Sequence, residues 1–294
     1  MTLIFKSLVS GFQRSLKVWK AVLIIWLFSF IIVSVYVSQA KNTTFAVFGN
    51  SMITNELYDN FNPAVFFEPG TGLRDAIISG FKGFPLLFLV FFVSNAFFTA
   101  GLFCKLRKKT EVFSISEFFR SGAEKFWPYL GITLIISILL ILLFITCVFL
   151  TLMVASFADI SSGKTVFILI VSSLMLFFLL MPVMILVSDY SRAWQAAASE
   201  KTPCKAVIFG FKTVFDKFGS SYFIMIILVL VQVIFTVAFV YITMHFRPST
   251  GAGVFLLFLL AQGMVIIRLI IKTWRYASIT ALMEIFAENE RYVS

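Results

Sequence analysis

The chain has 294 residues, of which 60% are hydrophobic and 13% are charged, and its formal net charge is +10. Soluble domains are about 45 to 50% apolar and about 25% charged, so this composition excludes a soluble globular protein. The length alone would allow one or two soluble domains. The apolar segments described next use nearly all of the chain, which predicts a single membrane domain over residues 1–294.

Six segments contain no Asp, Glu, Lys or Arg over 20 to 33 residues each. A hydrocarbon core about 30 Å thick is crossed by roughly 20 residues of helix, because each residue of an α-helix rises about 1.5 Å. The sequence therefore predicts an all-α, polytopic membrane protein with six transmembrane helices. The predicted spans lie at about 21–40, 83–104, 128–157, 165–188, 221–245 and 252–272.

The number of basic residues between the spans alternates from one side to the other. Of the 24 Lys and Arg residues, 19 fall on the side that holds both termini and five on the opposite side. The five are Lys41, Arg74, Lys82, Lys164 and Arg247. Because cytoplasmic segments retain Lys and Arg during insertion, this bias predicts a multi-pass protein of the cytoplasmic (inner) membrane with both termini in the cytoplasm.

The predicted cytoplasmic face carries the whole net positive charge, because nine acidic residues fall on it and the other five balance the five cations outside. Such a face is expected to attract membrane lipid with anionic headgroups. A protein partner, in the membrane or at this face, is the alternative. Nucleic acid is not expected, because no base-stacking or groove-reading motif accompanies the basic residues.

Three short amphipathic segments precede the first, third and fifth spans. In the first, apolar residues recur at helical spacing: Phe5, Leu8, Val9, Phe12, Leu16 and Trp19. In the second, Ser114 and Glu117 have the spacing of a capping box. In the third, Thr202 is placed to cap a helix that begins with Pro203. We predict three cytoplasmic amphipathic helices that lie flat in the inner headgroup region.

These segments also resemble one another. Gly11-Phe12, Phe118-Phe119 and Gly210-Phe211 align at offsets of 107 and then 92 residues, and each is followed by a span, an outer connection and a returning span. The pattern predicts three parallel repeats, each made of a surface helix and a transmembrane hairpin. The alternative is that any surface helix of this kind collects Phe, Gly and Lys without belonging to a repeat.

Three amides lie near the middle of predicted spans: Asn95, Gln232 and Gln262. They are candidates for a small mid-membrane polar site, and the alternative is that they hydrogen-bond neighbouring helices. Carboxylates and basic groups are absent at this depth, which argues against ion-coupled transport.

Seven basic residues near the cytoplasmic ends of the second and sixth spans are candidates to contact lipid headgroups or a partner. They are Lys105, Arg107, Lys108, Lys109, Arg268, Lys272 and Arg275. The alternative is that their long side chains simply extend from the membrane toward the headgroups, as such residues commonly do at helix ends.

The sequence shows no catalytic set. Three cysteines lie far apart along the chain, and the single histidine, His245, lies at the outer rim of the fifth predicted span. Metal and haem sites draw several His or Cys ligands together at one place. We therefore expect no catalytic residues, no metal, no cofactor and no enzymatic activity.

Three short patterns carry a family resemblance. They are Phe118-Phe119 to Phe126-Trp127 before a long span, Asp189 to Arg192 after the fourth span, and Lys272 to Arg275 after the sixth. In these the chain resembles a group of bacterial six-helix membrane proteins related to the membrane domain that is sometimes fused to glycerophosphodiester phosphodiesterases. The resemblance covers the whole chain in outline and implies a six-helix membrane fold. It does not imply phosphodiesterase activity, because the hydrolase domain is not in this sequence.

Two functions remain open from the sequence. The first is a non-enzymatic integral membrane subunit or scaffold that docks a partner or organises lipid through its basic cytoplasmic face. The alternative is a passive or partner-driven transporter of an apolar or lipid-like substrate, which the three amides, Pro182 and the long outer connection after the first span suggest.

Overall fold

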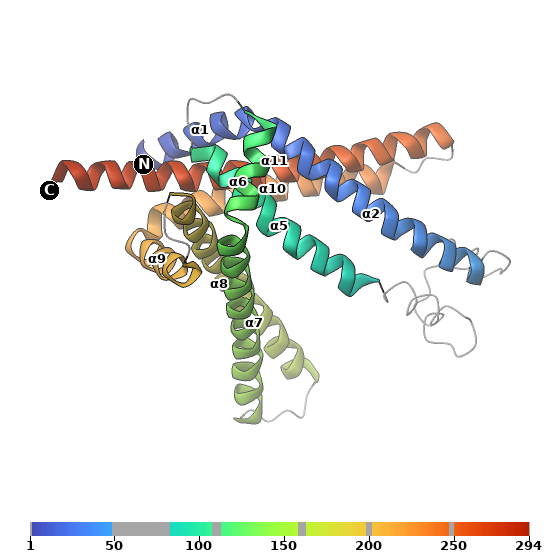
Figure 1. Ribbon diagram of the computed structural model, residues 1–294. Coiled ribbons are helices and arrows are strands. Elements are labelled where there is room, and N and C mark those ends of the chain that lie inside the picture. Colours follow the sequence, from blue (N-terminus) through green and yellow to red (C-terminus); the bar gives the residue numbers. More distant parts are fainter. Residues whose placement is uncertain are drawn as a thin grey trace. The chain divides into compact units, whose positions relative to one another are not determined.

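The structure is a computed structural model that describes residues 2–48, 83–107, 113–157, 163–197, 202–246 and 250–293. Within these ranges the regular structure is helical, and three short helices alternate with pairs of long ones (Figure 1). The short helices are α1 (Thr2–Lys17), α6 (Ile115–Glu124) and α9 (Pro203–Asp216). The long helices are α2 (Trp19–Phe48), α5 (Phe84–Arg107), α7 (Phe126–Phe157), α8 (Gly163–Ala197), α10 (Phe218–His245) and α11 (Gly251–Val293).

All six long helices are long and apolar enough to cross a membrane, which confirms an all-α, multi-pass membrane protein. Two of them run well past the predicted spans. The fourth span was expected to end at residue 188 and the sixth at residue 272, yet α8 continues to Ala197 and α11 to Val293. The first charged residue ends an apolar segment but does not end a helix, because each α-helix satisfies its own backbone hydrogen bonds in any solvent. Helix α8 also passes through Pro182 without a break.

Each short helix is separated from the following long helix by one residue outside the α-helix. These junction residues are Val18, Lys125 and Lys217, which are 107 and then 92 residues apart. The same offsets relate the three segments in the sequence, where Val18, Lys125 and Lys217 already align. The backbone thus changes direction at equivalent positions, as three repeats require.

The chain divides into two compact units. The smaller unit, Ile24–Asn95, contains most of α2 and the first half of α5. In it, Trp26 stacks on Phe30 with ring centroids 5.7 Å apart, and a Cβ on Gly83 would lie 3.0 Å from the ring of Tyr36. The stack lies within α2, whereas the approach of Gly83 to Tyr36 brings the residue before α5 close to α2, as small residues commonly do between membrane helices.

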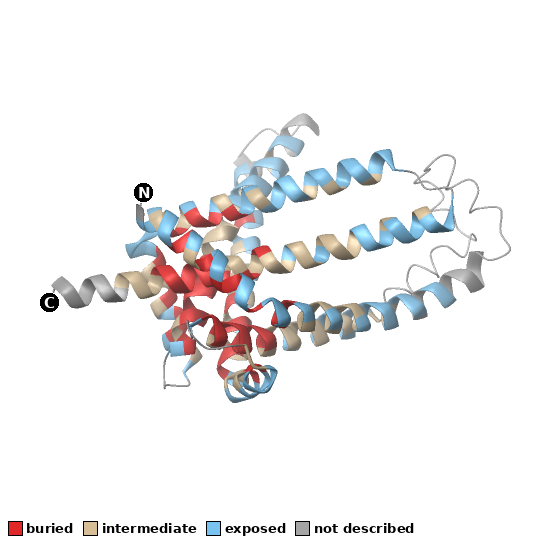
Figure 2. Ribbon diagram, turned by 90° about the horizontal axis from the view of Figure 1, so that it is seen from above, coloured by how far each residue is buried: buried red, intermediate tan, exposed pale blue. Residues whose placement is uncertain are grey.

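The larger unit comprises Met1–Leu23 and Ala96–Ser294, and its buried residues gather where the short helices meet the long ones (Figure 2). We call this region the base. It consists of the three short helices, the first turns of α2, α7 and α10 through Val22, Ile136 and Leu228, and the last turns of α5, α8 and α11 from Ala96, Leu186 and Ile271.

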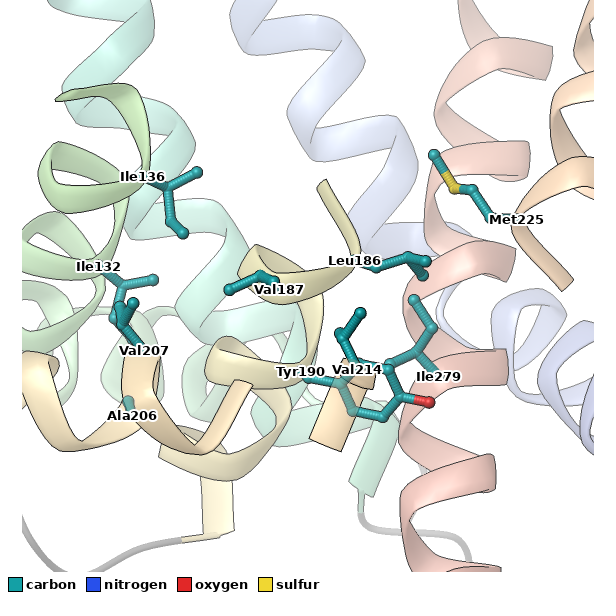
Figure 3. Close-up of a cluster of buried hydrophobic side chains, with 10 residues drawn as sticks. All are labelled: Ile132, Ile136, Leu186, Val187, Tyr190, Ala206, Val207, Val214, Met225 and Ile279. Atoms are coloured by element: carbon teal, nitrogen blue, oxygen red, sulfur yellow. The ribbon is translucent and has the colours of Figure 1, made fainter. Parts of the chain in front are cut away.

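Apolar side chains from five helices fill the base (Figure 3). Ile132 of α7, Val187 of α8, Val207 of α9, Met225 of α10 and Ile279 of α11 belong to one cluster. A second cluster joins Leu8 of α1 to α10 and α11. Away from the base, α7, α8, α10 and α11 expose many large apolar side chains, which fits contact with lipid rather than water.

Candidate functional site

The base is the part of the described structure in which charged and polar side chains converge, and its geometry begins with α1. A Cβ on Gly11 would lie 2.6 Å from the backbone nitrogen of Ser278 in α11, so only glycine permits this approach. The indole Nε1 of Trp274 donates to the carbonyl of Leu8 at 2.9 Å, and the rings of Phe12 and Trp274 meet edge to face. Helix α1 is thereby fixed to the last helix of the chain.

Helix α9 makes the equivalent contact with α8. A Cβ on Gly210 would lie 2.6 Å from the carbonyl oxygen of Val187 and would also collide with the hydroxyl of Ser191. Gly210 aligns with Gly11, and Ser191 takes the place that Ser278 has opposite Gly11. We call α5, α8 and α11, the second helix of each long pair, the returning helices. A glycine facing a serine therefore forms two of the three contacts between a short helix and a returning helix.

The third contact, between α6 and α5, uses the same aligned position of the short helix, but the large residue is on the short helix and the glycine is on its partner. Phe118 stands at the residue that aligns with Gly11 and Gly210, and it is fully buried. Opposite it lies Gly101, whose Cβ would be 2.7 Å from the carbonyl oxygen of Phe118. The glycine has moved from the short helix to the returning helix, so the close approach is kept.

A cation near each junction reaches the returning helix of its own repeat. Arg14 donates to the carbonyl of Leu106 at 3.3 Å, near the end of α5, and it forms an ion pair with Glu284 of α11 at 2.8 Å. Lys125 donates to the carbonyls of Gln195 and Ala196, at 3.0 and 2.8 Å, at the end of α8. Lys217 lies over the ring of Phe286 in α11. The first two cations thus satisfy carbonyls that a helix C-terminus leaves without partners.

These contacts close a ring. Each short helix packs on the returning helix that precedes it in the chain and reaches the returning helix that follows it. Helix α1 has no preceding returning helix in this chain, and it packs on α11 instead. The three returning helices also meet one another: Phe103 contacts Tyr276 with centroids 4.7 Å apart, Arg107 donates to the carbonyl of Ala196 at 3.4 Å, and α8 is joined to α11 by an ion pair.

That ion pair is formed by Arg275 of α11 and Asp189 of α8, with 2.7 Å between Nε and Oδ2. The Asp189 side chain is 1% exposed and that of Arg275 is 18% exposed. A second arginine lies close along α8, where Arg192 donates to the hydroxyl of Thr133 at 3.1 Å and its carbonyl accepts from Tyr129 at 2.7 Å. The centre of the base is therefore a polar network enclosed by apolar side chains.

A third ion pair changes the expected role of Glu117. Ser114 is the N-cap of α6, as the sequence predicts, but its side chain makes no capping hydrogen bond. Glu117 instead pairs with Lys105 of α5, whose side chain is 4% exposed. The predicted capping box is therefore wrong. A buried cation interacts more strongly with a carboxylate than a backbone N–H does, and it draws Glu117 away from the helix terminus. Thr202 is the N-cap of α9 with Pro203 after it, also without a side-chain cap bond.

The candidate headgroup contacts are placed in different surroundings. Lys105 and Arg275 form the internal ion pairs described above, and Lys272 lies over the ring of Tyr276. Arg107 and Arg268 are both exposed. Lys108 and Lys109 lie outside the described residues. The structure thus directs two of these cations into the protein, which the sequence did not indicate because their acidic partners are Glu117 and Asp189 on other helices.

The three mid-membrane amides belong to two different units of the chain, and the polar site that they would form stays a prediction. Asn95 belongs to the smaller unit and is half-buried. In the larger unit, Gln262 is half-buried and Gln232 is exposed on α10. Neither of the two pockets described for this chain is lined by an amide of this set.

One of those pockets lies in the base, where the ends of α5 and α8 meet α6 and its junction. It has a volume of about 520 Å³. Its lining residues are Cys104, Arg107, Glu117, Arg120, Ser121, Glu124, Lys125 and Ala196. The other pocket, of about 240 Å³, is apolar and lies between α7 and α8 away from the base.

Among the described residues, no three His, Cys, Asp or Glu side chains lie close enough to hold a metal ion. Sequence reasoning missed Asp189, Tyr129 and Glu284 as members of the polar network. Only the alignment of Gly11 with Gly210 signalled the packing that brings them together. No protein-family model, curated protein or solved structure matches this chain.

Proposed function

We propose that the protein is a non-enzymatic membrane scaffold or subunit of the inner membrane. In this proposal both termini and the base lie on the cytoplasmic side, where the base organises anionic lipid. The three hairpins present their apolar surfaces to lipid or to a membrane partner. The observation that carries the proposal is the outer face of the short helices.

Each short helix exposes large apolar side chains on its outer face, and α1 and α9 approach the protein closely at a glycine. On α1, Phe5 is 70% exposed although Gly11 and Ser15 are buried. On α9, Ile208 and Phe215 are 68% and 64% exposed. Trp127, just after the α6 junction, is 75% exposed. A helix at a membrane surface buries such side chains at the boundary between headgroups and acyl chains.

Exposed lysines accompany these apolar side chains. They are Lys6, Lys17, Lys20, Lys205 and Lys212 on or beside α1 and α9. A lysine at a cytoplasmic membrane surface contributes about 1 kcal/mol of attraction to anionic lipid.

The transporter remains an alternative proposal with less support. It rests on a polar site at mid-membrane depth, and the exposure of Gln232 on α10 gives that site no enclosed wall. The polar network of the base lies at the ends of the long helices, where it fixes helices to one another. A rigid base of this kind suits a scaffold better than a moving carrier.

Photo-crosslinking in intact membranes tests the proposal. A photoreactive residue at Ile208 should yield adducts with anionic phospholipid. The same residue at Phe178, which is exposed on α8 away from the base, should yield a discrete protein adduct if the chain is a subunit and lipid adducts alone if it is a scaffold.

Ile132, which is fully buried in the base, supplies the control position, where neither adduct should form. The proposal fails if Ile208 gives no phospholipid adduct. The subunit form of it fails if the protein isolated in mild detergent is alone and Phe178 crosslinks to lipid only.

A further inference from the structure

The charged pocket of the base has two kinds of lining group. Arg107 and Lys125 lie beside the end of α8, where both donate to the carbonyl of Ala196. Glu117 and Glu124 lie on α6. A pocket of about 520 Å³ lined by cations and by carboxylates is suited to a ligand that itself carries both signs of charge.

Arg107 retains capacity to donate. Arg107 uses one N–H of its Nη1 for Ala196, and a guanidinium has five N–H donors. Arg107 is also exposed, so its remaining donors are accessible from the pocket that it lines. Guanidinium groups bind phosphate through paired hydrogen bonds, which a neighbouring ammonium group strengthens as a second positive charge.

The carboxylates also retain capacity to accept. Glu117 contacts Lys105 through Oε2, and Glu124 contacts Arg120 through Oε1. Their side chains are 49% and 57% exposed, so the second oxygen of each can accept hydrogen bonds from a ligand. Two carboxylates in the lining would repel a ligand that carried negative charge alone.

We propose that this pocket binds an aminoalkyl phosphate, with its phosphate toward Arg107 and Lys125 and its primary ammonium toward Glu117 and Glu124. Both the headgroup of phosphatidylethanolamine and soluble phosphoethanolamine have this chemistry. The proposal goes beyond the proposed function, which assigns anionic lipid to the outer face of the short helices, because it adds a zwitterionic headgroup bound in a separate pocket.

Native mass spectrometry of the full chain in mild detergent provides the test, with three lipids supplied in equal amounts. Phosphatidylethanolamine should be retained above phosphatidylcholine, whose quaternary ammonium cannot donate a hydrogen bond, and above phosphatidylglycerol, which has no ammonium. Arg107→Ala should lower this retention about tenfold, as expected for one lost charge-assisted hydrogen bond. Glu124→Gln should reduce the preference over phosphatidylglycerol.

Lys212→Ala is the matched control, because Lys212 is an exposed cation on α9 outside the pocket, and its retention should equal that of the native chain. Thermal unfolding of each variant verifies that the base is intact. Displacement of the lipid by soluble phosphoethanolamine identifies the headgroup alone as sufficient. Lipid that stays bound, yet depends on Arg107, identifies the phospholipid as the ligand.

Equal retention of the three lipids by the native chain overturns the proposal, and so does unchanged retention in Arg107→Ala. Either result leaves the scaffold function standing as long as Ile208 still crosslinks to anionic phospholipid. Loss of that crosslink, with selective retention of phosphatidylethanolamine, would instead remove the scaffold function and leave the pocket.

Discussion

The smallest residues of the base set how closely its helices approach. Gly11 and Gly210 occupy equivalent positions, and each faces a serine and the backbone of a returning helix. Membrane helices gain little from burying apolar surface against one another, because lipid is equally apolar, so close packing of backbones is a main source of their association. Adding a single methyl group at such a position should therefore lower the stability of the fold by more than the volume of the group suggests.

Gly210→Ala tests this directly. The added Cβ would meet the carbonyl oxygen of Val187 at 2.6 Å, and a backbone atom cannot move aside as a flexible side chain can. Overpacking of this kind costs about 1 to 3 kcal/mol, so the midpoint of thermal unfolding in detergent should fall. Gly263→Ala is the control: Gly263 lies inside α11 with no neighbour within 4 Å, and its replacement should leave the midpoint unchanged or raise it.

Asp189 and Arg275 give the second prediction at this scale. Asp189→Asn leaves the positive charge of Arg275 without its partner in a buried site, which typically costs about 3 to 5 kcal/mol. The double variant Asp189→Leu with Arg275→Met removes both charges and should unfold at a higher temperature than Asp189→Asn. The exposed pair Arg120 and Glu124 is the control, and replacing Glu124 by Gln should have no measurable effect on unfolding. Equal melting of all these variants would contradict a stabilising role for the buried pair.

At the scale of the helix, the contact between α6 and α5 reverses the sizes found in the other two contacts. Phe118 on the short helix faces Gly101 on the returning helix, whereas elsewhere the glycine is on the short helix. The reversal gives α6 a surface that fits only α5, since a phenylalanine at this position would collide with Ser191 or Ser278. The pairing of short and returning helices is thereby specified.

A double variant tests the reversal. Phe118→Gly leaves a cavity and should destabilise the chain, and Gly101→Ser should do so by colliding with Phe118. Combined, the two changes recreate the glycine and serine of the other contacts. The double variant should therefore lose less stability than the two single losses added together, as measured by thermal unfolding. Simple additivity would show that the two residues are not coupled.

The long helices were predictable from the sequence, and the packing of the short ones was not. Absence of charge over 20 residues or more is a strong local signal, so all six long helices were found and the starts of α6 and α9 were correct. Helical periodicity located the apolar stripes, but it did not separate the stripe residues that pack inward, such as Leu8 and Val207, from those that face outward, such as Phe5 and Ile208. Nor did it show that small residues such as Gly11 and Ser15 form part of the packing face. The ion pairs of the base join residues that lie far apart in the sequence: Asp189 and Arg275 are 86 positions apart, and Arg14 and Glu284 are 270 apart. No local pattern gives a signal over such a separation.

At the scale of the whole molecule, the proposed orientation makes a labelling prediction. Cys204 is exposed on α9 and Gly251 is exposed at the start of α11. In a chain that keeps Cys204 alone, a membrane-impermeant maleimide should label only permeabilised cells. In a chain whose only cysteine is Gly251→Cys, it should label intact cells. Labelling of Cys204 from outside would reverse the orientation and move the base away from the cytoplasmic headgroups.

Because the contacts of the base form a ring, they do not depend on which of the three hairpins comes first in the chain. Helix α1 meets α11 just as α6 and α9 meet the long helices before them, so α1 packs as though it followed α11 in the chain. A circular permutant that starts at α6 and joins the old ends through a flexible glycine–serine linker should insert and melt near the native temperature. Failure to insert would show that the first hairpin must be made first. Success would show that the contact between α1 and α11 forms whichever of the two helices comes first in the chain.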